Sequence, residues 1–151
     1  MTTFLEREAI MPRIDGIKKN LARLRELGKL PFNEFSVGDP FDLTQHHLRL
    51  ALEGVFHIGS HILSRLPGGR AVEYREIAEK LGDLGLIDRK FAHEKLTKMA
   101  GLRNLLVHRY ADIDAKKIHK LVKTDLKDIE LFLKEIKKIL ENPKKFGLEI
   151  N

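Results

Sequence analysis

The 151-residue sequence contains no cysteine and no tryptophan. Without cysteine the chain can form neither a disulfide framework nor a thiolate metal site. No apolar run approaches the roughly 20 residues that a membrane-spanning helix needs, and the first residues lack the basic-then-apolar pattern of a secretory signal. We therefore expect a cytoplasmic protein without a membrane segment.

Several catalytic motifs are also absent from the sequence, among them a GxxxxGK[ST] phosphate loop, a GxGxxG segment after a strand and an HExxH zinc motif. His57 and His61 stand four residues apart, a spacing at which one helix can present two metal ligands. No third ligand motif lies near this pair. We predict no metal site and no cofactor, which leaves acid–base chemistry by side chains.

The chain carries a net charge of +6 that is spread along its length rather than collected in a basic block. This balance is compatible with binding a polyanion, but it is a weak indication of nucleic-acid binding by itself. The contents of 42% hydrophobic and 33% charged residues are typical of a globular protein. We predict a single domain over residues 1–151, with a core of about 5–140 and a frayed tail over 141–151.

The spacing of apolar residues predicts about five helices and no strands. Asp42 and Gln45 have the spacing of a capping box, and Asp88 is suited to begin the fourth helix. The predicted helices span 3–28, 42–66 and 73–81, then run from Asp88 into 103–110 and from 112–114 to Asn142. The second of them is apolar on more than one face, so it is either central or shared with a second copy. The sequence predicts an all-α, up-and-down bundle.

The segment RNLLVHRY, residues 103–110, places four chemically distinct side chains at the end of the fourth predicted helix. At about 100° per residue, Asn104 lies one turn from His108 and could orient its imidazole by a hydrogen bond. Tyr110 lies two turns from Arg103, on a neighbouring face. A helix end with a favourable positive charge and a buried histidine would also explain these residues.

Arg103 and His108 diverge by about 140° on one helix. A bend after Leu106, or a second copy of the chain, would bring both to one target. Together they suit RNA cleavage, in which the ribose 2′-OH attacks its own phosphodiester and leaves a 2′,3′-cyclic phosphate. His108 would transfer protons and Arg103 would hold the scissile phosphate. Glu53, one turn before His57, is a candidate to hydrogen-bond an arginine of a neighbouring helix.

The pattern Arg103-x4-His108-x-Tyr110, with Asn104 after the arginine and Val107 before the histidine, resembles the signature of HEPN-domain proteins. It is most similar to HepT-like toxins of HepT–MntA (HEPN–MNT) toxin–antitoxin systems. Softer similarities cover roughly residues 5–140, at 48–63, 74–76, 84–87 and 112–114.

The resemblance implies a HEPN-like fold and a C2 homodimer in which two Arg-x4-His motifs share a cleft. It implies a metal-independent endoribonuclease with Arg103 and His108 as catalytic residues and Asn104 in a supporting role. It also implies that a partner minimal nucleotidyltransferase, the antitoxin, adenylylates Tyr110. Two alternatives remain: a non-catalytic nucleotide-binding or adaptor module that supports a neighbouring nucleotidyltransferase, and a purely structural helical dimer.

Overall fold

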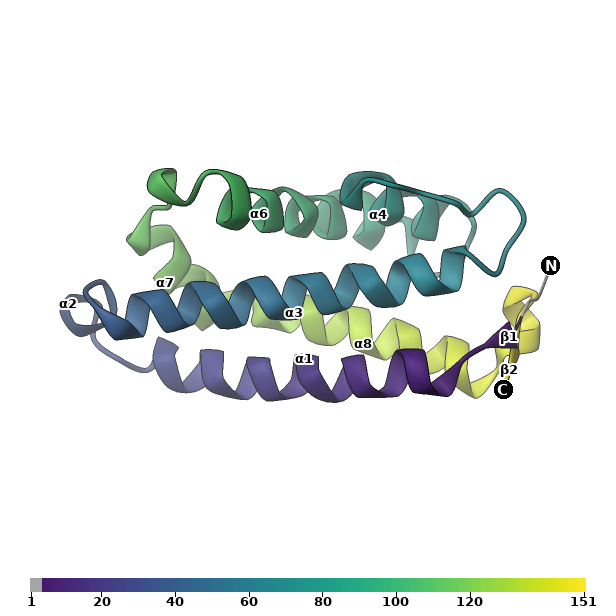
Figure 1. The fold of residues 1–151 in the computed structure, drawn as a ribbon, viewed down its shortest axis with the longest axis horizontal. Helices are drawn as coiled ribbons and strands as arrows, with labels where there is room; N and C mark the ends of the chain where they lie inside the picture. Colours follow the sequence, from purple (N-terminus) through teal and green to yellow (C-terminus); the bar gives the residue numbers. More distant parts are fainter. Residues whose placement is uncertain (1–3) are drawn as a thin grey trace.

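A computed structural model describes residues 4–151 of the chain, apart from the side chain of Tyr110, and its architecture is helical (Figure 1). Three long helices, α1 (Arg7–Gly28), α3 (Asp39–Leu63) and α8 (Leu126–Glu141), run along the molecule. The shorter helices α4 (Tyr74–Asp83) and α6 (Thr97–His108) pack on α3. The predicted all-α bundle is confirmed. None of the helices in the described part of the chain is long and apolar enough to cross a membrane.

Helix α3 is the central element of the bundle, and it contacts α1, α4, α6 and α8. Its buried side chains point in several directions and comprise Leu48, Ala51, Leu52, Val55, Phe56, Ile58, Ile62 and Leu63. Of the two explanations for its apolar character, the central position is therefore confirmed. Because one chain covers these residues, they no longer argue for a second copy, and the homodimer stays a prediction.

The start of α3 differs from the predicted capping box. The helix begins at Asp39, directly after Gly38 with φ of 66°, so Asp42 lies inside the first turn. The hydroxyl of Thr44 donates to the carbonyl of Pro40 at 2.7 Å, a bond between residues within the helix. The proline near the first helical position favours the earlier start, because it needs no N–H partner there. Between the first two predicted helices, where the sequence predicted no helix, the structure has a short one, α2 (Phe32–Phe35).

The fourth predicted helix is continuous but irregular. It consists of α5 (Arg89–Phe91), a π-helical turn, η1 (Ala92–Leu96), and α6. The carboxylate of Asp88 accepts the N–H of Phe91 at 2.9 Å, which confirms the predicted N-cap. A π-helical turn accommodates one extra residue, so it rotates the faces that follow relative to a regular helix.

The last predicted helix is divided at Asp125 into α7 (Ala115–Thr124) and α8. Asp114 caps α7 by accepting the N–H of Lys116 at 2.9 Å. At the break, the Thr124 hydroxyl hydrogen-bonds the Lys120 carbonyl at 2.8 Å and the Asp125 carboxylate at 3.0 Å. Such side-chain bonds compete with the regular helical pattern. The division lets α7 pack on α1 and α2 while α8 packs on α3.

The C-terminal tail is ordered, so the predicted fraying of 141–151 is wrong. A 3₁₀ turn, η3 (Pro143–Phe146), leads into β2 (Glu149–Ile150), which pairs in parallel with β1 (Phe4–Leu5). Leu148 is only 1% exposed. Its burial anchors the tail beside the first residues, and both ends of the described chain lie together (Figure 1).

Candidate functional site

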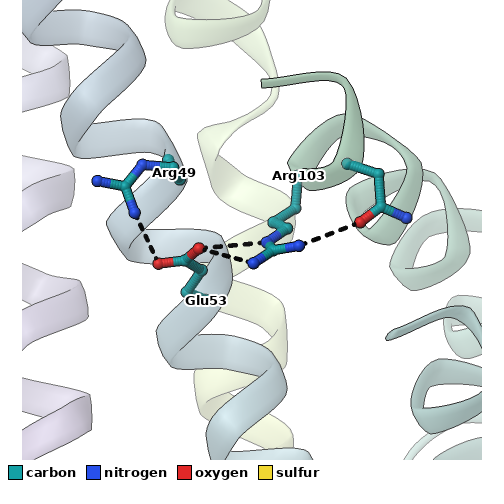
Figure 2. A network of polar contacts seen from close by, with 4 residues as sticks. Arg49, Glu53 and Arg103 are labelled. Carbon is teal, nitrogen blue, oxygen red and sulfur yellow. Dashed lines mark hydrogen bonds and ion pairs between the residues drawn. The ribbon is translucent and has the colours of Figure 1, made fainter. Parts of the chain in front are cut away.

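Arg103 projects from α6 toward α3, where Glu53 receives it (Figure 2). Its Nε and Nη2 groups donate to one oxygen of Glu53 at 3.2 and 3.0 Å. The other Glu53 oxygen accepts from Nη1 of Arg49 at 2.9 Å. The side chains of Arg103 and Glu53 are 21% and 17% exposed. The predicted hydrogen bond between Glu53 and an arginine of a neighbouring helix is therefore present, with Arg103 as donor and Glu53 as acceptor, in a partly desolvated position.

The Arg103 guanidinium also donates from Nη1 to Oδ1 of Asn104 at 3.4 Å. A guanidinium carries five N–H groups in a planar fork. Within the described part of the chain, three of them have acceptors, and two on Nη1 and Nη2 remain. These two can still donate to an incoming anion, the arrangement that favours phosphate or carboxylate recognition by arginine.

An aromatic ring, that of Tyr74, also contacts the same guanidinium. The Cζ atom of Arg103 lies 4.6 Å from the centre of the Tyr74 ring, a cation–π distance. Tyr74 also stacks on Phe56, with ring centres 4.8 Å apart and planes inclined by 14°. Sequence reasoning gave no individual role to Tyr74. It also missed Arg49, although the four-residue spacing between Arg49 and Glu53 is a signal that could have found it.

The predicted hydrogen bond between Asn104 and His108 is not formed. The amide oxygen of Asn104 accepts from Arg103 instead. A hydrogen bond from a charged donor is stronger than one between neutral groups, which accounts for this preference. His108, the last residue of α6, is exposed, and no side chain or backbone group among the described residues hydrogen-bonds its imidazole.

Helix α6 runs without interruption through Leu106 to His108, so the predicted bend that would bring Arg103 and His108 together is absent. Both residues nevertheless border one open hollow of about 390 Å³ between the start of α4 and the end of α6. The hollow is lined by Val72, Glu73, Tyr74, Arg75, Arg103, Asn104 and His108. Arg75 adds a second guanidinium at this rim, 76% exposed and paired with Glu79 at 3.4 Å.

Tyr110 does not share a helical face with Arg103. The helix ends at His108, Arg109 adopts φ of −135°, and Tyr110 begins a 3₁₀ turn, η2 (Tyr110–Asp112). Arg109 and Asp112 form an ion pair at 2.9 Å across this turn. The predicted orientation of the tyrosine hydroxyl toward the cleft concerns a side chain outside the described residues.

His57 and His61 of α3 have separate environments. Nε2 of His61 accepts the backbone N–H of Glu6 at 3.1 Å, which requires the neutral imidazole at that nitrogen. Burial lowers the pKa of His57, as does Arg13, while Glu53 opposes the shift. Residues 4–151, as far as they are described, hold no group of three or more His, Cys, Asp or Glu side chains able to bind a metal.

The sequence matches the family described as Ribonuclease HepT-like over residues 17–136. The chain belongs to the HepT-like ribonuclease family. The match includes Glu53, Tyr74 and the whole RNLLVHRY segment, so the hollow and its polar network lie inside the region that defines the family.

Two named relatives align with almost the entire length of this chain. A "tRNA nuclease HepT" of Aphanizomenon flos-aquae is 27% identical over 139 residues, which cover 91% of this chain and 94% of that protein. An "mRNA nuclease HepT" of Shewanella oneidensis is 27% identical over 133 residues, covering 86% and 97%. The relatives are thus nucleases named for different RNA classes.

Solved structures of HepT-like toxins share this fold. The tri-AMPylated Shewanella oneidensis HEPN toxin in complex with its MNT antitoxin has a TM-score of 0.78 and 26% identity, over 86% of this chain and 97% of that one. A mutant form of a MntA–HepT toxin–antitoxin complex has a TM-score of 0.76 and 26% identity, over 87% and 98%. These structures show the HEPN-like fold in chains that are toxins bound to a nucleotidyltransferase antitoxin.

Proposed function

We propose that this protein is the toxin of a toxin–antitoxin pair and acts as a metal-independent endoribonuclease. One observation carries the proposal: a guanidinium with two remaining N–H donors borders the same hollow as an exposed imidazole. The family membership and the nuclease names of the relatives support the same activity.

The two side chains suit cleavage by the substrate's own nucleophile. An imidazole near neutral pH takes the 2′-OH proton, the 2′ oxygen attacks phosphorus, and the 5′ oxygen leaves with a proton from a second acid. The products are a 2′,3′-cyclic phosphate and a 5′-hydroxyl. Arg103 donates to the non-bridging oxygens and stabilises the charge that develops on them in the transition state. Asn104 supports Arg103 rather than His108.

A homodimer completes this site. Each chain has one His108, whereas in-line cleavage uses a base and an acid on opposite sides of the phosphorus. The unbroken α6 leaves association of two chains as the way to bring a second imidazole to the phosphate. We therefore place the two hollows against each other across a C2 axis.

Cleavage of total RNA by the purified protein tests the activity, with His108→Ala as the negative control. A 5′-labelled oligonucleotide should then yield 2′,3′-cyclic phosphate ends in excess EDTA, and a 2′-deoxy nucleotide at the cut site should block cleavage. Metal-dependent cleavage with 5′-phosphate products would contradict the mechanism. RNA binding without cleavage would favour the adaptor alternative.

Control by a minimal nucleotidyltransferase antitoxin is the second part of the proposal. AMP on Tyr110 would add bulk and negative charge two residues from His108, and so repel the RNA phosphate. Incubation with the cognate antitoxin and ATP should add AMP that maps to Tyr110 on digestion, and RNA cleavage should stop. Tyr110→Phe should still cut RNA and should escape inhibition by nucleotide transfer. AMP on another residue, with full inhibition of that variant, would contradict this role.

A further inference from the structure

Two structural restraints, a carboxylate and an aromatic ring, act on the Arg103 guanidinium. Glu53 accepts two N–H groups in the plane of the fork, at 3.2 and 3.0 Å. The Cζ atom of Arg103 lies over the Tyr74 ring, 4.6 Å from the ring centre. The carboxylate alone would permit the fork to swing about the shared oxygen, because both bonds end on the same atom. The ring removes that freedom.

The ring itself is immobilised by the core. Phe56 is fully buried and stacks on Tyr74. Phe56 follows Glu53 by three residues on α3, so one turn of this helix provides both the carboxylate and the backing of the ring. Because buried Phe56 holds the Tyr74 ring and the ring contacts Arg103, the packing of the core helps to fix where the guanidinium lies.

The position of Tyr74 follows from how α4 packs. Tyr74 begins a stripe with Ile77, Ala78 and Leu81 that faces the core. A Cβ atom at Gly59 would lie 2.9 Å from Leu81 and 3.0 Å from Ile77. Only a glycine there lets α4 approach α3 this closely, and that approach brings the first residue of α4 under Arg103.

We propose that Tyr74 is a positioning residue that holds the Arg103 guanidinium in place for the RNA phosphate. The inference rests on the proposed ribonuclease function, and it adds a residue from a different helix to the site. Its ring, rather than its hydroxyl, performs this role. The hydroxyl has no hydrogen-bond partner within the described part of the chain, whereas the ring contacts both Arg103 and Phe56.

Three variants distinguish the effect of losing the aromatic ring from the effect of disturbing the packing of the core. Tyr74→Phe keeps the ring, Tyr74→Leu removes it, and Phe91→Leu is the matched control, a partly buried aromatic that packs on the core from α5. The Nε–H signal of Arg103 in a proton–nitrogen correlation spectrum, assigned with Arg103→Lys, reports the ring directly. Tyr74→Leu should shift this signal downfield, because the ring-current shielding is lost. Tyr74→Phe and the control should leave it in place.

Kinetics on the same variants test the consequence for catalysis. Tyr74→Leu should lower kcat by about 10-fold to 10²-fold with a much smaller change in KM, since misplacing a catalytic group acts on the transition state. Tyr74→Phe should stay within about 3-fold of wild type because phenylalanine also presents a cation–π face. If Tyr74→Leu does not fold, Tyr74→Met, which fills the space without a ring, replaces it.

The outcomes distinguish this inference from the proposed function. An unchanged Arg103 signal in the ring-free variant, or a Tyr74→Phe variant as impaired as Tyr74→Leu, would overturn the positioning role. If wild-type protein cut no RNA, the proposed function would fail, and the Arg103 signal would still decide whether Tyr74 orients the guanidinium.

Discussion

Arg103 and His108 belong to one helix and border one hollow, yet they differ in how far a single chain prepares them. Arg103 is fixed by a carboxylate from α3, an amide from α6 and a ring from α4. His108 is exposed at the end of α6, and no described residue hydrogen-bonds its imidazole. The difference indicates that the fold of one chain positions Arg103, for which we propose phosphate binding, whereas His108, for which we propose proton transfer, is left for association or substrate to orient.

The largest expected effect is a loss of RNA cleavage when His108, which no described residue hydrogen-bonds, is replaced. His108→Ala should lower the rate by at least about 10²-fold, the usual scale for a lost general acid or base. Its melting temperature should match wild type, since the side chain is exposed. His46→Ala, which alters another exposed histidine that does not line the hollow, is the control and should retain activity. A large loss of stability in His108→Ala would mean that the imidazole has a structural role.

Mixed subunits test whether the exposed imidazole depends on a second chain. If one cleft uses His108 from both chains, a mixture refolded from equal amounts of wild-type and His108→Ala chains should have about one quarter of the activity of the same total amount of wild-type protein. Independent sites would keep about one half. A linear dependence on the wild-type fraction would contradict the shared cleft, and the measurement needs only rates at several mixing ratios.

The stability of the fold should depend on the contacts that hold Arg103. Glu53→Ala leaves the partly buried Arg103 without its main acceptor, so we expect the free energy of unfolding to fall by roughly 1–3 kcal/mol. Cleavage should also decrease, by about 10-fold, because the fork is displaced. Urea denaturation measures the first effect. Arg49→Ala removes only the outer partner of Glu53 and should change stability by less than about 0.5 kcal/mol.

The smallest effect concerns pH and a histidine outside the hollow. Burial, with help from Arg65 and Arg13 and opposed by Glu6, lowers the pKa of His61 below its ordinary value of 6.5. A group with a lowered pKa contributes stability above its unfolded value, and that contribution is lost as the pH falls. Wild type should therefore lose stability below about pH 6.5. His61→Gln should flatten this part of the curve, as thermal melts between pH 8 and 5 would show; an unchanged slope would contradict the assignment.

Local signals in the sequence predicted much of the helical architecture. Apolar periodicity identified the central helix, and Asp88 and Asp114 begin helices as their capping chemistry requires. The same reasoning failed where short-range rules compete with packing. It extended the last helix across Asp125, started α3 at Asp42 and left the tail unstructured, although burial of Leu148 orders it.

The sequence by itself determined that arginine, amide and imidazole lie within two turns at the end of a helix, because helical geometry acts between near neighbours. It also pointed to Glu53 as a partner for an arginine. Only the tertiary structure decided that Tyr74, 29 positions before Arg103, lies beneath its guanidinium. That contact depends on the close approach of α4 to α3 at Gly59 and on the rotation of α6 after the π-helical turn. Both arise from packing across the core, which no local pattern in the sequence encodes.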